Sequence, residues 1–200
     1  MFPTVPSGTV VQNIIRVIFL EKAAVFIDGG YLSKILKGQF ASEKIDYSVF
    51  SDIICNDYKR LRTYYYDCLP YQENPPTEDQ KLRYAERQRF ITALDNLPRF
   101  EVRLGKLTRN MVNGSWKYEQ KRVDVLFSVD LVRMSWAHQI EYAVIVTGDS
   151  DYVPAVKAAK DAGITVKLCY NRASIHNELF TEVDERYEID QALIDKAKSP

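Results

Sequence analysis

The feature that most constrains this fold is a repeated succession of apolar runs and amphipathic segments along the 200 residues. The predicted strands cover 23–27, 61–67, 100–107, 142–147 and 164–170. Most of them are continuously apolar, which is typical of a mostly parallel sheet that is covered on both faces. We therefore predict an α/β fold, a three-layer α/β/α sandwich with a mostly parallel central sheet.

Apolar residues at helical spacing fill the intervals between these strands. The predicted helical segments cover 31–37, 47–59, 79–97, 123–137 and 151–163. Asn113 and Gly114 indicate a turn within 107–120, in a hairpin or an exposed loop. The tail from Asn171 to Pro200 is predicted to add terminal helices to the same domain.

Length and composition favour one domain over residues 23–200, preceded by an extension, 1–22, whose role the sequence does not define. The apolar run 17–20 is too short to span a membrane, and no signal peptide is indicated. Three cysteines without CxxC spacing and only two histidines argue against a disulfide framework and a zinc site, so a cytoplasmic protein is expected.

Acidic residues recur where strands end and helices begin. Asp28 and Asp149 follow predicted strands, while Asp124 and Asp151 open predicted helices. Taken singly, each is explained by helix capping. Because the carboxyl ends of parallel strands meet at one edge of the sheet, up to four acids are expected to converge there.

Converging carboxylates repel one another unless a cation lies between them. Oxygen ligands without histidine or thiol favour Mg²⁺ or Mn²⁺. Such an ion at the end of a parallel sheet suits phosphate chemistry. No GxSxG, phosphate-binding loop or Cys–His pair offers another nucleophile.

Two further aspartates are predicted to have other roles. Asp130 lies six residues after Asp124, which on a helix is a rotation of about 240°, so the two should not share a face. Asp130 is therefore expected to be structural or to support the site indirectly. Asp67 ends a strand at the same edge but is expected to form part of a cleft wall.

Three ordered segments, VFIDGGYL at 25–32, KRVDVLFSVD at 121–130 and VTGDSDYVPAVKAAKDAGITV at 146–166, resemble the NYN domain family, the PIN-like nucleases of the LabA (DUF88) type. The resemblance runs from about Ala23 to Tyr187. It implies a PIN-like fold and metal-dependent hydrolysis of RNA phosphodiester bonds.

The resemblance also assigns residues by position. Asp28, Asp124 and Asp149 match the acidic metal-binding and catalytic set, with Asp151 as a further acid. Lys121 matches the lysine before the second motif's aspartate, and Asp130 matches a recurrent acid. Two positions depart from the pattern: Tyr31 stands where many members have asparagine, and Arg122 where a small residue is common.

The formal net charge is zero, so RNA binding requires a local basic surface. Lys121 and Arg122 are predicted to bind substrate because they adjoin Asp124, whereas Lys81 to Arg89 are expected to be a solvated helix face. Trp116 and Tyr118 either stack on the bases of single-stranded RNA or serve packing or dimer contacts.

Several alternatives stay open at this stage. The acids could bind a cation in a non-catalytic RNA-binding or regulatory module with the same fold. A Mg²⁺-dependent phosphatase or receiver-like domain is a second rival, although the DGG sequence at 28–30 lacks a DxD nucleophile pair. The sequence also leaves open whether the protein acts alone or as a homodimer.

Overall fold

The computed structural model describes residues 21–56, 58–112 and 115–198. Their centre is a six-stranded sheet in the order β3-β2-β1-β6-β7-β8, in which every pairing is parallel. The strands are β1 (Lys22–Asp28), β2 (Lys59–Asp67), β3 (Phe100–Leu104), β6 (Tyr142–Val146), β7 (Thr165–Tyr170) and β8 (Glu185–Glu188).

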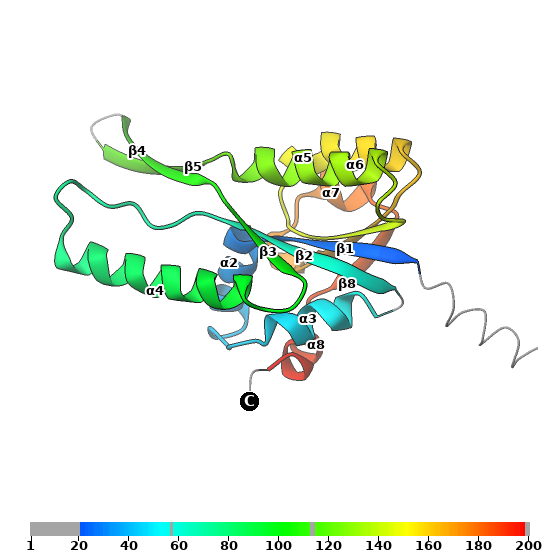
Figure 1. The fold of residues 1–200 in the computed structure, drawn as a ribbon, viewed down its shortest axis with the longest axis horizontal. Helices are drawn as coiled ribbons and strands as arrows, with labels where there is room; N and C mark the ends of the chain where they lie inside the picture. Colours follow the sequence, from blue (N-terminus) through cyan, green and yellow to red (C-terminus); the bar gives the residue numbers. More distant parts are fainter. Residues whose placement is uncertain (1–20, 57, 113–114, 199–200) are drawn as a thin grey trace, which may run out of the picture.

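Helices cover both faces of this sheet, so the predicted three-layer sandwich is confirmed (Figure 1). One layer contains α2 (Gly29–Gln39), α3 (Tyr47–Ile54), α4 (Glu78–Asp95) and α8 (Gln191–Lys196). The other contains α5 (Val123–Trp136), α6 (Val153–Asp161) and α7 (Asn177–Glu182). None of the helices among the described residues is long and apolar enough to cross a membrane.

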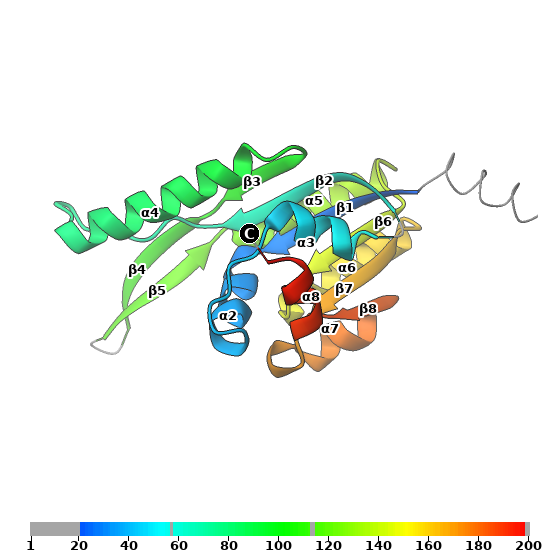
Figure 2. The same cartoon turned by 90° about the horizontal axis from the view of Figure 1, so that it is seen from below.

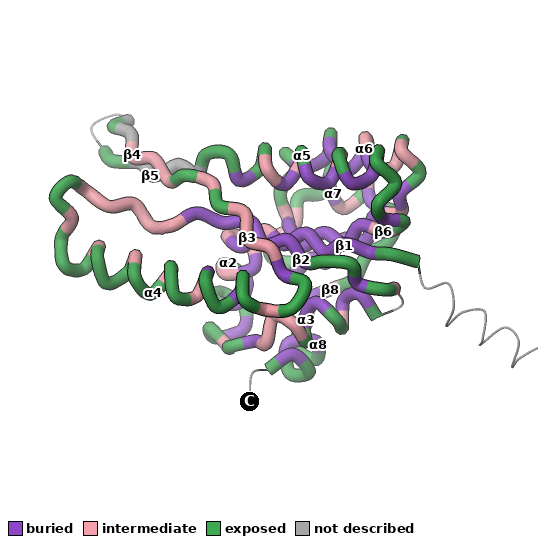
Figure 3. The backbone as a smooth tube through the Cα atoms, in the orientation of Figure 1, coloured by how far each residue is buried: buried purple, intermediate pink, exposed green. Residues whose placement is uncertain are grey.

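Strand β1 shows why the strands of this sheet are continuously apolar in sequence. Its residues 23–27 are all buried, and successive side chains enter different cores. Val25 and Ile27 pack with α2 and α3, whereas Phe26 packs against Phe127 of α5. The buried strands lie between the two exposed helical surfaces in Figure 3. Side chains alternate along a strand, so Asp28, two residues after Phe26, lies on the same face as Phe26 and points toward the α5 layer.

The order of the strands places a switch point between β1 and β6. From β1 the chain adds β2 and β3 on one side, then returns across the sheet to add β6, β7 and β8 on the other. In open parallel sheets, ligands bind outside the carboxyl ends of the strands at this point of reversal. Asp28 ends β1 here, and residues Thr147 to Asp149 follow β6.

The structure corrects several predicted boundaries. The strand expected over 100–107 is broken at Gly105, and the chain continues as an antiparallel hairpin of β4 (Lys106–Val112) and β5 (Ser115–Lys121). The predicted turn residues Asn113 and Gly114 lie outside the described residues. The amphipathic run 47–59 ends its helix at Ile54.

The carboxyl-terminal part also differs from the prediction. A short 3-10 helix, η1 (Ser150–Tyr152), precedes α6, and a second, η2 (Arg172–Ser174), precedes α7. The predicted terminal helices are present as α7 and α8, but β8 between them also adds a sixth strand to the sheet. Residues 1–20 of the predicted extension lie outside the described residues. All three cysteines are buried.

Candidate metal centre at the ends of strands β1 and β6

Asp28 is held at the switch point by backbone and side-chain hydrogen bonds. The amide of Tyr31 donates to its Oδ1 atom at 2.9 Å, so Asp28 caps α2. The hydroxyl of Thr147, just beyond β6, donates to Oδ2 at 3.4 Å. The next residue must be small because a Cβ on Gly29 would lie 2.6 Å from the Tyr65 ring. The capping prediction is therefore correct for Asp28, and the carboxylate also joins the two central strands.

Asp149 lies on a loop that only glycine allows to close. A Cβ on Gly148 would lie 2.0 Å from the Ser174 carbonyl oxygen and 2.5 Å from the Tyr31 ring. The amide of Asp149 donates to the Thr147 hydroxyl at 3.3 Å, and its Oδ1 atom accepts from the amide of Asp151 at 3.0 Å. This loop brings Asp149 to the same edge as Asp28.

Asp124 lies in the first turn of α5, so it is placed at this edge by the start of a helix and not by the end of a strand. Strand β5 ends at Lys121, and Arg122 adopts a left-handed conformation with φ of 74°, which turns the chain into the helix. The hydroxyl of Tyr152 donates to Oδ1 of Asp124 at 3.0 Å. The Tyr152 ring is fully buried, with its centroid 4.3 Å from that of Phe127.

The three predicted acids interact electrostatically around the Tyr152 hydroxyl. Burial, together with the negative charges of Asp28, Asp124 and Asp149, raises the pKa of Tyr152 far above its ordinary value. Burial also raises the pKa of Asp28 to about 6, with a smaller increase from the charge of Asp124 and opposition from the hydrogen bond of Tyr31. The fold therefore brings the three carboxylates into one neighbourhood.

This donor set fits Mg²⁺ or Mn²⁺ in its chemistry. Asp124 and Asp149 each use Oδ1 in the hydrogen bonds above, which leaves Oδ2 of each as a ligand atom. A cation would also relieve the repulsion that Asp28 and Asp124 exert on each other. Within the described part of the chain, no three His, Cys, Asp or Glu side chains already have metal-ligand spacing. The acids are thus neighbours, but their side chains do not have the spacing of a formed metal site.

Asp151 differs from the other three acids in its surroundings. Its backbone amide donates to Oδ1 of Asp149. Its side chain is exposed and lines a depression between α5 and α6 with Val129 and Pro154. The four predicted acids are therefore not equivalent. The role of Asp151 as a metal ligand remains a prediction.

Asp130 has the structural surroundings that its helical position predicts. It is buried, and it accepts from the Tyr66 hydroxyl at 3.1 Å, Arg103 at 3.3 Å and Arg133 at 3.1 Å. This network joins α5 to strands β2 and β3 and occupies a different face of α5 from Asp124. Its two arginine partners compensate the buried charge.

Asp67 corrects the prediction of a cleft wall. It is buried, forms an ion pair with Arg87 of α4, and accepts from the Cys68 amide at 2.7 Å. Burial raises the pKa of Asp67, against the opposing charge of Arg87. The guanidinium of Arg87 also lies 4.7 Å from the Phe90 ring centroid. Asp67 therefore fixes the long helix to the sheet.

The predicted substrate-binding pair, Lys121 and Arg122, is exposed beside Asp124. Lys121 lies opposite Lys106 across the hairpin, which adds a third cation to this region. By contrast, Lys81 and Arg83 on α4 pair with acids within one turn of the same helix. Lys81, Arg83 and Arg89 agree with a solvated helix face. Arg87 does not, because its half-buried guanidinium pairs with the buried Asp67. The side chain of Tyr118 lies outside the described part of the chain.

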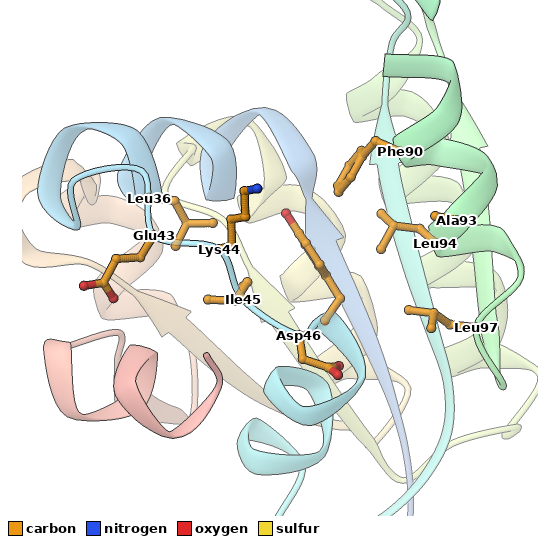
Figure 4. A pocket seen from close by; sticks show the side chains of 10 residues that line it. Leu36, Glu43, Lys44, Ile45, Asp46, Phe90, Ala93, Leu94 and Leu97 are labelled. Atoms are coloured by element: carbon orange, nitrogen blue, oxygen red, sulfur yellow. The ribbon is translucent and has the colours of Figure 1, made fainter. Parts of the chain in front are cut away.

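A separate pocket of about 460 Å³ lies between α4 and the connection from α2 to α3 (Figure 4). It is lined mainly by apolar side chains, including Leu36, Ile45 and Leu94. Asp46 is also at this pocket, but its carboxylate caps α3 through the amides of Ser48 and Val49. The pocket is in the layer opposite Asp124, so its chemistry is separate from that of the acids.

Sequence reasoning missed Thr147 and Tyr152. A threonine two residues before, or a tyrosine three residues after, a predicted acidic ligand is a weak signal. Here the roles of both residues depend on partners more than twenty residues away. Tyr152 lies one turn beyond Asp149, and its position against α5 defines which acid it contacts.

Comparisons with known proteins agree with this architecture. A family model described as the NYN domain matches residues 22–190. A crystal structure of a protein of unknown function from Vibrio parahaemolyticus has a similar fold, with a TM-score of 0.62 and 16% sequence identity over 86% of this chain and 94% of that chain. A search of curated proteins finds no match.

Proposed function

This chain belongs to the NYN domain family, and from that premise we propose that it is a metal-dependent ribonuclease that hydrolyses RNA phosphodiester bonds. The proposal is supported by the position of Asp28, Asp124 and Asp149 at the switch-point edge of the sheet, where Tyr152 donates to Asp124 and all three charges raise the pKa of Tyr152. Nuclease activity is the coarse expectation from the family. The LabA subtype and the metal-dependent mechanism are our proposals.

In this proposal Asp28, Asp124 and Asp149 hold Mg²⁺ or Mn²⁺, and Asp151 is a further acid at the rim. When bound, the ion would neutralise charge on phosphoryl oxygens and lower the pKa of the attacking water. Thr147 orients Asp28, and Tyr152 orients Asp124.

Lys121 and Arg122 are proposed to bind the phosphates of RNA next to the acids. They are exposed at the end of β5, directly before the helix that carries Asp124. Because the whole chain has no net charge, such a local cationic surface must attract the substrate.

We also propose a cytoplasmic location, because three cysteines without CxxC spacing give no disulfide framework and suit a reducing compartment. A homodimer remains a prediction. Light scattering after size-exclusion chromatography would give the mass in solution.

The test is cleavage of a labelled single-stranded RNA in Mn²⁺, Mg²⁺ or EDTA. We expect metal-dependent cleavage by the wild type and loss of at least 100-fold in Asp28→Asn and Asp149→Asn, as for groups that act directly on developing charge. Asp161→Asn is the matched control, because Asp161 is an exposed aspartate at the end of α6. Circular dichroism confirms that each variant is folded.

Two results would favour the alternatives. RNA binding by wild type, without cleavage in any metal, would indicate a non-catalytic RNA-binding module. Release of inorganic phosphate from monoesters, without cleavage of RNA, would indicate a phosphatase. Full metal-dependent activity in the double variant of Asp28 and Asp149 would rule out this site.

A further inference from the structure

The β4–β5 hairpin extends beyond the ends of the central strands (Figures 1 and 2). It lies between β3 and α5 in the chain and pairs in a separate two-stranded sheet. We call it the hairpin arm, residues 106–112 and 115–121. Among the described residues of the arm, Leu107 packs against the core beside α5, and the exposed residues further along the arm are left for other contacts.

The base of the arm is packed against the start of α5. The amide of Gly105 donates to the Asp67 carbonyl at 2.8 Å. A Cβ on Gly105 would lie 2.5 Å from the side chain of Val123 and 2.6 Å from the Lys121 carbonyl oxygen. Val123 precedes Asp124, so the arm and the acid-bearing helix share one tightly packed junction.

An exposed aromatic side chain is held in place on the arm. Trp116 is 51% exposed, and the guanidinium of Arg109 lies 3.8 Å from its ring centroid. Arg109 is itself fixed by an ion pair with Glu73 and lies 5.4 Å from the Tyr71 ring centroid. The cross-strand partner of Trp116, Met111, is 57% exposed. One face of the ring is therefore supported by a cation, and the ring still presents half of its surface to solvent.

The charges between this ring and the acids favour a polyanion. Lys106, Lys121 and Arg122 are exposed at the base of the arm. Trp116 and Lys121 are five residues apart in β5, a separation of about 17 Å at the rise of a strand. Along the chain, Lys121 and Arg122 come between the exposed ring and Asp124. Because side chains alternate along β5, Lys121 and its partner Lys106 lie on the face of the arm opposite Trp116, so a bound strand would cross the edge of the arm. An exposed aromatic ring with nearby cations is the combination that binds unpaired bases and their phosphates in sequence-tolerant sites.

We propose that the hairpin arm binds single-stranded RNA, with Trp116 stacking on a base and the cations at the base of the arm leading the strand to the acids. The proposal rests on the proposed function for its substrate class, and it adds a binding site away from the metal centre. A ring that already packs against the Arg109 guanidinium has less conformational freedom to lose on stacking. An unpaired base is required because bases within a duplex are already stacked.

The test measures binding apart from cleavage. Fluorescence anisotropy of a labelled oligouridylate, in EDTA and with Asp149→Asn as the parent protein, reports affinity without metal or turnover. We expect Trp116→Ala to weaken binding about tenfold, which is within the range for loss of one stacked base. We expect Trp116→Phe to retain most of the affinity, because a phenyl ring can still stack.

The second tryptophan provides a matched control. Trp136 is 59% exposed at the other end of α5, away from the arm. Trp136→Ala should bind RNA as the parent does. In Trp136→Phe, Trp116 is the only remaining tryptophan, and RNA should quench its fluorescence. Quenching should be absent when Trp116 is replaced by phenylalanine instead.

The outcomes separate this proposal from the proposed function. Equal RNA affinity in Trp116→Ala and its parent would overturn the hairpin arm proposal, even if the wild type cleaves RNA. Binding that depends on Trp116, without any cleavage by wild type, would support the arm and reject the nuclease. No binding of single-stranded RNA at all, or equal binding of duplex RNA, would also overturn it.

Discussion

Single aspartates in this protein have two roles at once. Asp28 caps α2 through its Oδ1 atom, as its position at a strand end predicts. Its Oδ2 atom accepts from Thr147, and its charge interacts with Asp124 across the switch point. Asp28 can therefore cap a helix and also contribute a carboxylate oxygen to a metal site. A cap alone does not explain why the carboxylate is partly buried beside another acid.

Asp28 predicts an unusual pH dependence of stability. Its pKa rises from 3.8 to about 6 on folding, mainly through burial. The folded state thus binds the proton more tightly, and stability must fall as pH rises through this interval. We expect a loss of about 2 kcal/mol in the free energy of unfolding, allowing for partial exposure.

The measurement is urea denaturation in EDTA between pH 4 and pH 7, with wild type and Asp28→Asn. The asparagine variant should lack this decrease and become the more stable protein near neutral pH. Adding Mg²⁺ should restore wild type but not the variant. A difference between the two proteins that is independent of pH would contradict the burial of an uncompensated carboxylate.

At the scale of elements, apolar, aromatic or alternating runs are enough to predict five of the six strands of the central sheet. β8 was missed because its residues, ERYE at 185–188, are charged and the strand lies at the sheet edge. The run over 100–107 was assigned to one strand because its alternation continues through Gly105. Strand β3 ends at Leu104, and Gly105 packs closely against Val123 at the start of α5. Such a contact joins distant segments and has no local signal.

Substituting alanine for each of two glycines compares a tightly packed position with an open one. Gly148→Ala should destabilise the protein by about 1–3 kcal/mol, because its Cβ would meet a backbone oxygen 2.0 Å away. Gly38→Ala, in α2 with nothing within 4 Å, should stabilise by about 0.4–1 kcal/mol.

Thermal and urea unfolding give both changes, and RNA cleavage provides a second readout. Gly148→Ala should also lose activity, since the same loop carries Asp149. Equal stability in the two variants would mean that the loop after β6 is not held against Ser174 as the structure has it.

At the scale of the whole molecule, the sequence predicted a covered parallel sheet but not the order of its strands. The order places β1 beside β6 and creates the switch point between Asp28 and Asp149. Convergence of the acids could be predicted because strand ends share an edge. The contact between Tyr152 and Asp124 could not be predicted, since it depends on how α5 packs against the start of α6. Asp67 was misassigned for a related reason, because its partner is on α4.

The most direct test of the central claim is Mn²⁺ binding at neutral pH, measured by isothermal titration calorimetry. Asp28, Asp124 and Asp149 are separated by 96 and 25 residues in the chain, so a shared ion requires the whole fold. We predict that wild type and Asp161→Asn bind Mn²⁺ equally and that Asp124→Asn does not. Tyr152→Phe should bind about tenfold more weakly, as expected when a residue that orients a ligand is lost. Unchanged Mn²⁺ affinity in Asp124→Asn would contradict a metal centre at these acids.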